Sequence, residues 1–293
     1  MTAPTFSVVI TTYNRPRQLR SCLAALGRSA YPSEAFEVIV LDDGGHDPLN
    51  GLVAEFRSMP RVTLVAQRNG GPASGRNCGA RVARHEFLAF TDDDCEPAPG
   101  WLPALARRLQ SAPDALVGGR TVNGLPENPY SCASQLIVNM AYAFYNADPA
   151  AARFFAANNL ALSTRLFLEF GGFDERFRVS EDRDFCDRWR HHVHSLAYEP
   201  EALVVHRHPL TLASFWRQQF RYGRGAARFH EACATRHSGR LRDHVGFHLQ
   251  LPRWWRRAIA TEPHRVRPAR VLPPLALWQL ANACGYVCER LRL

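Results

Sequence analysis

The feature of this sequence that most constrains its fold is an alternation of short apolar segments with helical segments. Four runs of mostly apolar or β-branched residues have the length of buried strands. They are FSVVI at 6–10, EVIVL at 37–41, VTLVA at 62–66 and FLAF at 87–90. A segment with helical spacing of apolar residues follows each of the first three runs. This order predicts an α/β fold in which helices cover the faces of a parallel sheet.

Polar residues follow three of these runs at the point where each predicted strand ends. The sequence reads TTYNR after the first run, DDGG after the second and TDDD after the fourth. In open parallel sheets, ligands bind outside the carboxyl ends of the strands, where such residues come together. The sequence therefore predicts a ligand site at one edge of the sheet.

The most unusual of these groups is the run of three carboxylates at Asp92, Asp93 and Asp94. Adjacent carboxylates repel one another and lose solvation when a loop is partly enclosed. A cation among them removes that penalty, so a divalent metal site is one interpretation. A solvated acidic turn that caps a helix is the other, because aspartate also favours turns and N-caps.

The charged residues exclude some chemistry and separate the chain into two parts. All 36 basic residues are arginine, which excludes lysine nucleophiles, Schiff bases and the lysine of a Walker loop. Residues 1–206 hold 20 arginines and 23 acidic residues, a net charge of −3. Residues 207–293 hold 16 arginines and 4 acidic residues, a net charge of +12. The C-terminal part is therefore predicted to meet an anionic surface.

The eight cysteines lack the spacing of a zinc site or a CxxC pair, and the N-terminal residues do not resemble a signal peptide. We therefore expect reduced thiols in a cytoplasmic protein.

Six motifs occur in an order that resembles family 2 glycosyltransferases of the GT-A fold. They are SVVITTYNRP, VIVLDDGG, GGPASGRNCG, FTDDDCEPAPGWL, GGFDERF and SEDRDFCDRW, and the resemblance covers roughly residues 5–225. It implies a Rossmann-like, mixed but mostly parallel sheet with helices on both faces and a C-terminal helical appendage. The implied domains are a GT-A domain at 1–235 and a basic, mostly helical segment at 236–293. Within the first, the nucleotide-sugar half is about 1–120 and the acceptor half about 121–235.

The resemblance implies a metal site that holds Mg²⁺ or Mn²⁺ through hard oxygen ligands. The outer members of the family's DxD motif correspond to Asp92 and Asp94. Asp93 leaves the register open, because it could replace Asp92 as the contact to the sugar or ribose. His206 matches the position of a metal-binding histidine in some relatives, and a core or acceptor-site histidine is the alternative.

The nucleotide sugar is expected at the end of the first predicted strand. The resemblance places the base near Thr11 and Tyr13, with Asp43 accepting a hydrogen bond from a ring N–H. Arg15 and Arg76 are the implied donors to the diphosphate. For Asp43 the alternative is a structural aspartate in the turn before two glycines.

Inversion at the anomeric carbon requires a base on the face opposite the leaving group. The resemblance assigns this role to Asp182, with Glu181 beside it, and an N-terminal helix cap is the alternative. Further candidates to contact the acceptor or the diphosphate are Asn159, Gln219, Arg221 and Arg224.

The resemblance therefore implies a metal-dependent, inverting transfer of a sugar from a nucleoside-diphosphate sugar to an unidentified glycan, lipid-linked or small-molecule acceptor. Two other classes remain open at this point: a nucleotidyltransferase-like enzyme and a non-catalytic nucleotide-sugar-binding protein. A nucleic-acid partner is not expected, because no recognised binding module is visible.

The last part of the chain contains RWWRR at 253–257 and then 18 residues without charge at 271–288. That length is at the lower limit for crossing a bilayer, and the stretch contains two prolines. A helix that lies in the interface of an anionic membrane, on its inner face, is one interpretation. A helix buried in the protein's own core is the other.

Overall fold

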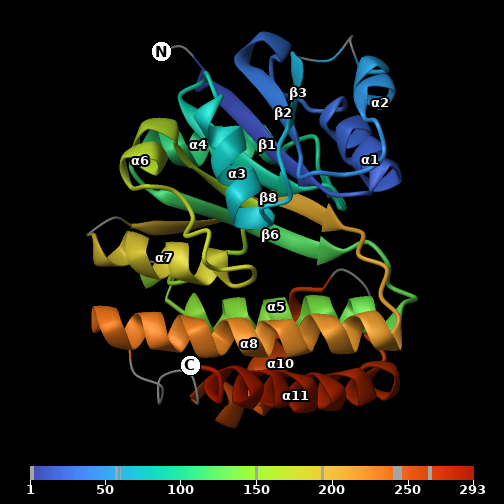
Figure 1. Ribbon diagram of the computed structural model, residues 1–293, viewed down its shortest axis with the longest axis vertical. Coiled ribbons are helices and arrows are strands. Elements are labelled where there is room, and N and C mark those ends of the chain that lie inside the picture. Colours follow the sequence, from blue (N-terminus) through green and yellow to red (C-terminus); the bar gives the residue numbers. More distant parts are fainter. Residues whose placement is uncertain are drawn as a thin grey trace. The chain divides into compact units, whose positions relative to one another are not determined.

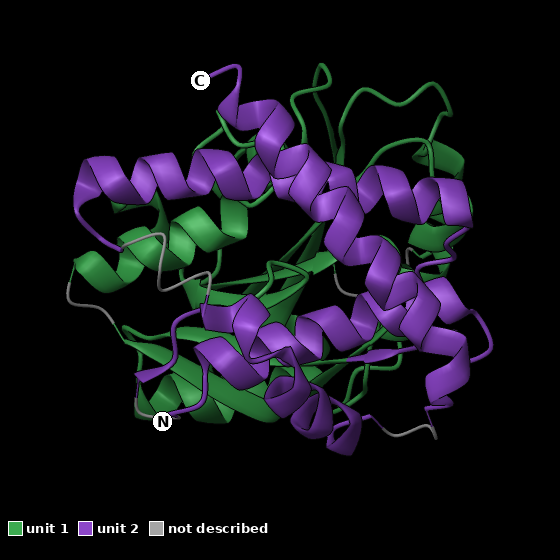
Figure 2. Cartoon of the chain, turned by 90° about the horizontal axis from the view of Figure 1, so that it is seen from below, with its two compact units in different colours: residues 1–121, 155–206 green, residues 122–154, 207–293 purple. Residues whose placement is uncertain are grey.

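The computed structural model describes residues 3–56, 59, 61–148, 151–192, 195–239, 246–262 and 266–293. The chain forms two compact units, which Figure 2 shows in green and purple. Unit 1 comprises residues 1–121 and 155–206, and unit 2 comprises residues 122–154 and 207–293. Of the predicted C-terminal segment at 236–293, residues 240–245 and 263–265 lie outside the described residues.

Unit 1 contains the sheet and the helices that surround it (Figure 1). Its strands are β1 (Phe6–Thr12), β2 (Phe36–Asp42), β3 (Val62–Ala66), β4 (Phe87–Asp92), β5 (Cys95–Pro97), β6 (Leu116–Asn123, whose last two residues belong to unit 2), β7 (Asn159–Ser163) and β8 (Leu196–His206). Its helices are α1 (Pro16–Leu26), η1 (Ser33–Ala35), α2 (Asn50–Ala54), α3 (Pro72–Arg81), α4 (Trp101–Ser111), α6 (Thr164–Glu169) and α7 (Glu181–His191).

The strands form one sheet in the order β3-β2-β1-β4-β7-β6-β8-β5. Strands β3, β2, β1 and β4 run parallel, whereas β7 pairs antiparallel with both β4 and β6, and β5 pairs antiparallel with β8. β1 lies between β2 and β4, so the carboxyl ends of three parallel strands are neighbours. This arrangement is the mixed sheet that the sequence predicts.

The core of unit 1 explains why these segments become strands. Val8, Ile10 and Val38 are completely buried and pack against apolar residues of the surrounding helices, including Leu23 and Leu105. β-Branched and aliphatic residues fit a sheet that is covered on both faces. The observed β1 and β4 each continue two residues beyond their predicted apolar runs, which brings polar residues into the strand ends.

Unit 2 consists mainly of helices, which are α5 (Pro129–Tyr145), α8 (Leu212–Arg236), α10 (Leu251–Ala260) and α11 (Pro268–Arg290). They enclose a second core that includes Met140, Phe215 and Trp278. α8 and α11 cross closely at Gly223 and Gly285 (Figure 2): a Cβ at either glycine would come within 2.0 Å of a backbone oxygen of the other helix. Only glycine allows this approach of the two backbones.

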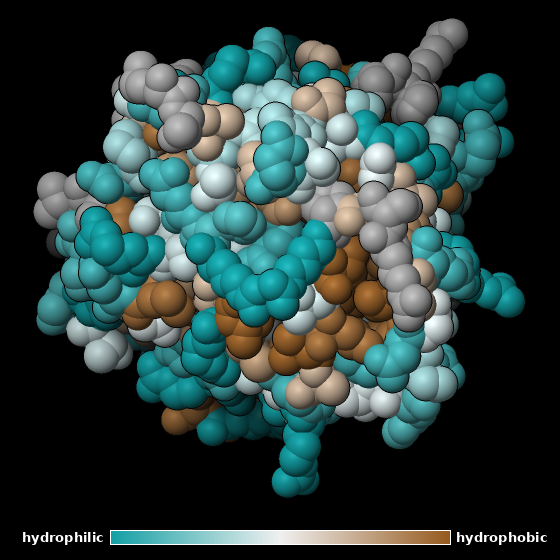
Figure 3. Space-filling model, turned by 90° about the horizontal axis from the view of Figure 1, so that it is seen from above, coloured by the Kyte–Doolittle hydropathy of each residue, from teal (hydrophilic) through white to brown (hydrophobic). Residues whose placement is uncertain are grey.

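The sequence-predicted fold class is confirmed, including helices at the C-terminal end. α8 continues past the predicted domain boundary at residue 235, and that boundary stays a prediction. Within the part of the chain that the structure describes, no helix combines the length and the apolar character needed to cross a bilayer. The view in Figure 3 shows mainly hydrophilic residues with a smaller hydrophobic group among them.

Candidate active site

The pairing of the strands brings the polar strand ends of unit 1 together. In the register of the sheet, Thr11 lies opposite Asp92 of β4, and Thr12 lies opposite Asp42 of β2. Thr11 is partly exposed, and Tyr13 directly after the strand exposes 46% of its surface. The predicted convergence of the three polar clusters on one edge therefore occurs.

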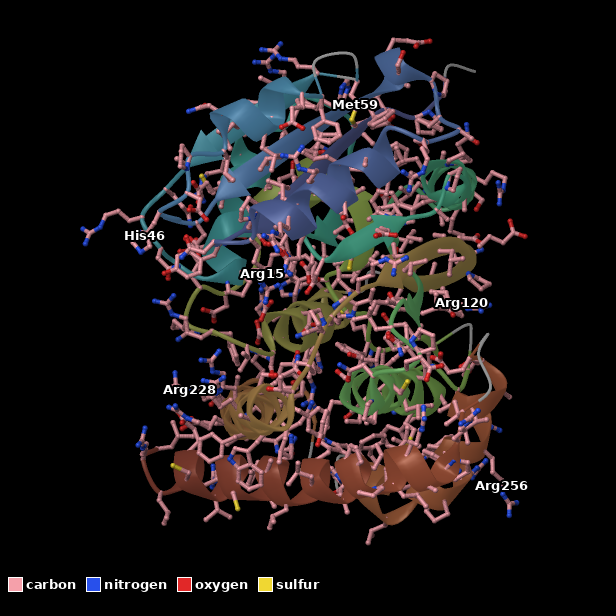
Figure 4. All side chains as sticks on the ribbon, turned by 90° about the vertical axis from the view of Figure 1, so that its right-hand side faces the viewer. Arg15, His46, Met59, Arg120, Arg228 and Arg256 are labelled. Carbon is pink, nitrogen blue, oxygen red and sulfur yellow. The ribbon has the colours of Figure 1, made fainter. Side chains whose placement is uncertain are left out.

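The three adjacent carboxylates have different surroundings. Asp93 is buried, accepts a hydrogen bond of 2.8 Å from the Thr12 hydroxyl and lies 3.2 Å from an Arg15 nitrogen. Asp94 is also buried and lies 3.1 Å from the same nitrogen. Arg15 itself is half-exposed on a segment after β1, and Figure 4 labels its side chain. One arginine thus offsets the repulsion between two buried carboxylates.

Burial raises the pKa of Asp93 to about 7, and the negative charge of Asp94 adds to this effect. Arg15 and the Thr12 hydroxyl act in the opposite direction because both stabilise the carboxylate. The Asp93 side chain is therefore buried and bonded to other residues of the protein. Thr12, which the sequence analysis did not select, is its hydrogen-bond partner.

Asp94, Cys95 and His206 bring potential metal-ligand atoms within 4.8 Å of one another. His206 is the last residue of β8 and lies opposite Cys95 of β5, which places its Nε2 3.2 Å from Asp94. Burial is the largest single effect on the pKa of His206 and lowers it, but the charge of Asp94, its hydrogen bond to the ring and the charge of Asp92 together raise the pKa above its usual value. Burial keeps the Cys95 thiol protonated by raising its pKa well above the usual value. Asp94 and His206 are thus the better ligands of the three.

Arg76 connects the acidic run to the second acidic pair. Its guanidinium lies 2.7 Å from Asp92 and 2.7 Å from Glu181, although Glu181 is 105 residues away in the sequence. Arg76 is 4% exposed, and its ion pair with the buried Glu181 lies away from water, whereas the Asp92 side chain is about one-third exposed. Its two terminal nitrogens position carboxylates, while its buried Nε has no partner among the described residues.

Asp182 lies in the first turn of α7, next to Glu181. Burial raises the pKa of Asp182 to about 7, and the charge of Glu181 raises it further, while Arg76 opposes the shift. Its carboxylate accepts a 2.8 Å hydrogen bond from the backbone N–H of Arg183. The N-cap of α7 is Ser180, so Asp182 is not the capping residue. A carboxylate with a pKa near 7 is suited to proton transfer.

Two non-glycine residues with positive φ lie next to these groups. Asn14 has a φ of 54° between Tyr13 and Arg15, and Ser180 has a φ of 67° directly before Glu181. Backbone strain of this kind is concentrated at functional sites, where the surrounding structure holds it in place. Both positions therefore support a site at this edge.

Asp43 organises a neighbouring turn. Its carboxylate accepts hydrogen bonds from Gln67 and from the backbone N–H groups of Gly70 and Gly71, at 2.7 to 2.9 Å. Gly71 has a φ of 86° and precedes α3. This geometry gives Asp43 a structural role toward the turn before α3, which differs from the predicted turn before Gly44 and Gly45, and its contact to a nucleotide base stays a prediction.

Asn159 is completely buried at the start of β7. Its amide nitrogen donates to the carbonyl groups of Arg120 and Ala202, and its oxygen accepts from the Trp101 indole. These bonds tie three segments of unit 1 together. Both amide hydrogens are therefore used internally, and a contact to substrate stays a prediction.

The three other candidates for the acceptor or the diphosphate lie on α8 in unit 2. Gln219 is buried, Arg221 is exposed, and Arg224 forms an ion pair with Glu289 of α11. The structure describes the two units separately, so a role of these residues beside the carboxylates stays a prediction.

The sequence profile of Glycosyl transferase family 2 matches residues 7–167, which is more than half of the chain. The chain therefore belongs to glycosyl transferase family 2. This finding confirms the family predicted from the sequence and the predicted enzyme class, a glycosyltransferase.

Two curated relatives illustrate the similarity. The hyaluronan synthase of Pasteurella multocida is 27% identical over 216 residues, which cover 61% of this chain and 22% of that protein. The pre-mycofactocin glycosyltransferase of Mycobacterium tuberculosis is 29% identical over 225 residues, which cover 75% and 46%. This chain thus spans less than half the length of either relative.

Among solved structures, a mannosyltransferase from Pyrobaculum calidifontis in complex with GDP-Man and Mn²⁺ has the same fold. The TM-score is 0.72 at 18% identity, and the match covers 99% of this chain and 89% of that one. This similarity confirms the predicted GT-A fold.

Proposed function

We propose that this protein transfers a sugar from a nucleoside-diphosphate sugar to an acceptor hydroxyl, with inversion and with the help of a divalent ion. The observation that carries the proposal is the network in which Arg76 joins Asp92 to Glu181, beside Asp182. The network supports the proposal because it joins Asp92 of the acidic run to Glu181, which is adjacent in sequence to the candidate base.

In this reaction Asp182 accepts the proton of the acceptor hydroxyl. The acceptor oxygen then forms a bond to the anomeric carbon, and the bond from that carbon to the diphosphate oxygen breaks on the opposite face. The pKa of Asp182, about 7, gives the carboxylate enough basicity for this role while it remains substantially ionised near neutral pH. Arg76 holds Glu181 and Asp92 in place, so it is a positioning residue.

The donor set of the site fits a divalent ion. Asp94 offers carboxylate oxygens and His206 a ring nitrogen 3.2 Å away, and Mn²⁺ accepts both kinds of ligand. Asp92 is the third candidate, with its side chain about one-third exposed. When bound, the ion would neutralise the charge of the departing diphosphate. Arg15 contacts the same Asp94 carboxylate and is half-exposed, which lets it turn toward an anionic ligand.

The identity of the donor and of the ion is also part of this proposal. The Pyrobaculum structure contains GDP-Man and Mn²⁺, which supports a nucleotide-sugar donor and Mn²⁺ here. Mg²⁺ is the alternative ion because it prefers the same oxygen ligands. Asp93 faces Thr12 and Arg15, so Asp92 is the better candidate for a contact to the ribose or sugar.

We also infer that the protein works at the inner surface of the cytoplasmic membrane. The net charge of +12 over residues 207–293 supports an anionic surface as a partner, because basic residues are attracted to anionic lipids.

The proposed reaction is tested by donor hydrolysis with UDP-, GDP- and dTDP-sugars in the presence of Mn²⁺ or Mg²⁺. We expect release of one nucleoside diphosphate that depends on the ion. The variants Asp94→Asn and His206→Gln should weaken Mn²⁺ binding, measured by calorimetry, by about tenfold or more.

The matched control is Asp174→Asn, which removes a carboxylate paired with Arg176 in unit 1 outside the acidic run. Its Mn²⁺ affinity should equal that of the wild type. Unchanged Mn²⁺ binding in Asp94→Asn would contradict the metal assignment and favour the structural acidic turn.

A further inference from the structure

Helix α11 is apolar on two opposite sides. Its inner side is buried through Val271, Trp278 and Ala281, which contribute to the core of unit 2 or to the contact with α8. Near its end, the buried Glu289 pairs with Arg224 and Arg228 of α8 and fixes the two helices together. A helix packed in this way on a soluble protein normally carries polar residues on its other side.

The outer side of α11 is instead exposed and apolar. Leu272, Leu280 and Val287 expose 54%, 58% and 56% of their surfaces, and Leu291 after the helix exposes 83%. Further exposed positions on the same side carry Ala269 before them and Pro273, Ala276, Ala283 and Cys284 between them. The spacing of three or four residues places all of these on one face over the length of the helix.

This concentration is specific to unit 2. Large exposed hydrophobic residues in the described part of unit 1 are limited to Tyr13, Val82 and Leu168. The residues of unit 2 that the structure describes include eight, and five of these are in or directly after α11. Contiguous exposed apolar surface of this kind marks a binding surface. Figure 2 looks toward this region, where α11 crosses in front of α8.

An apolar groove adjoins the outer face. Leu212, Ala213 and Trp216 of α8 and Leu277 of α11 line it, and Arg217 contributes the charged group. Its volume is about 640 Å³ and it is open to solvent. Leu277 is one helical turn from Leu280, so the groove and the outer face form a continuous apolar surface.

The positive charge near this apolar surface indicates what kind of partner binds it. Arg217 lies at the groove, Arg267 precedes α11, and Arg290 and Arg292 are exposed at its end. Figure 4 shows the Arg256 side chain of α10 extending away from the ribbon. A second copy of this chain would bring like charges together across the interface. An anionic lipid surface provides the opposite charge and accepts the apolar side chains at the same time.

We propose that the outer face of α11, together with the adjoining groove, is the surface that docks onto an anionic lipid bilayer. Leu272, Leu280 and Val287 enter the region between headgroups and acyl chains, and the arginines around them contact lipid phosphates. The helix lies parallel to the membrane, because its opposite side is bound to unit 2. This assignment rests on the membrane attachment inferred above and does not depend on the transfer reaction.

The test is co-sedimentation of the full chain with vesicles of phosphatidylcholine alone or mixed with phosphatidylglycerol. The wild type should bind the mixed vesicles only, and binding should decrease as the salt concentration rises. The double variant Leu272→Gln/Leu280→Gln should bind about tenfold or more weakly, because burial of the exposed halves of the two leucine side chains together changes an equilibrium constant by at least that factor.

The matched control is Val82→Gln/Leu168→Gln, which replaces two similarly exposed apolar residues of unit 1. Its vesicle binding should equal that of the wild type. Equal loss in both double variants, or no loss in the α11 variant, would overturn the assignment of this face. Equal binding of the wild type to neutral vesicles would overturn the choice of an anionic surface.

Two further measurements separate the remaining outcomes. If the wild type does not bind vesicles and light scattering shows a dimer that the α11 variant converts to a monomer, the face binds a second copy and the proposal is wrong. Donor hydrolysis should be the same in both double variants and the wild type. If neither the wild type nor the two double variants hydrolyse a donor, the transfer reaction is refuted and the vesicle-binding result is unaffected.

Discussion

Replacing Asp182 with asparagine is expected to remove transfer activity and to stabilise the protein above neutral pH. The structure raises the pKa of Asp182 from 3.8 to about 7, mainly through burial. The folded protein therefore holds a proton that the unfolded chain releases between about pH 4 and pH 7. Over that interval the wild type loses stability as the pH rises, whereas asparagine cannot ionise.

The magnitude follows from the size of the shift. A difference of about three pKa units corresponds to about 4 kcal/mol at 1.36 kcal/mol per unit. Asp182 keeps part of its exposure to solvent, so we expect about half of this value, roughly 2 kcal/mol. That corresponds to a rise in Tm of about 4 to 8 °C above about pH 7, and to almost no change below about pH 4.

The assay is thermal unfolding of the metal-free protein, followed by tryptophan fluorescence across this pH range, together with transfer rates. Removal of a general base should lower the rate about 10²- to 10⁴-fold. The control is Asp184→Asn on the same helix. Asp184 is completely buried and pairs with Arg188 at 2.7 Å, so this variant should lose about 3 kcal/mol.

A lower stability of Asp182→Asn than of the wild type at about pH 8 would refute this reasoning. That result would mean that the ionised carboxylate stabilises the N-terminus of α7. A transfer rate close to that of the wild type would refute the assignment of the base.

Two further variants test one contact inside each unit: the ion pairs of Arg76 in unit 1 and the crossing of α8 and α11 in unit 2. Arg76→Met should lower the free energy of unfolding by about 3 kcal/mol in thermal unfolding, because it leaves two carboxylates without their partner. It should also move the maximum of turnover to higher pH, since Arg76 lowers the pKa of Asp182. The control is Arg176→Met, which replaces an exposed arginine. The same pH profile in both variants would contradict the effect of Arg76 on Asp182. Gly285→Ala should lower the stability of unit 2 by about 1 to 3 kcal/mol, because the new Cβ would lie 2.0 Å from a backbone carbonyl of α8. Gly100→Ala, which has open space around it, should leave the melting temperature almost unchanged, and an equal effect of both substitutions would show that the close crossing is not essential.

The sequence by itself determined the alternation of strands and helices from β1 to β4 and the edge of the sheet that carries the site. Periodicity is a local property, so the apolar runs at 6–10 and 87–90 located β1 and β4 within two residues. The rule that ligands bind at the carboxyl ends of parallel strands then placed Asp92 and Asp94 at that edge. The motif order was sufficient for the family.

The tertiary structure decided which of these side chains meet. Asp92 and Glu181 share Arg76 across 105 residues of sequence, and His206 reaches Asp94 only because β8 pairs with β5. The roles of Thr12 and Arg76 follow from such contacts, which no local pattern contains. A carboxylate's pKa and the exposure of Leu280 depend in the same way on groups that are distant in the sequence and adjacent in space. Local spacing could therefore indicate that residues 271–288 are apolar, whereas only packing against α8 and the core of unit 2 decided which side of α11 remains exposed.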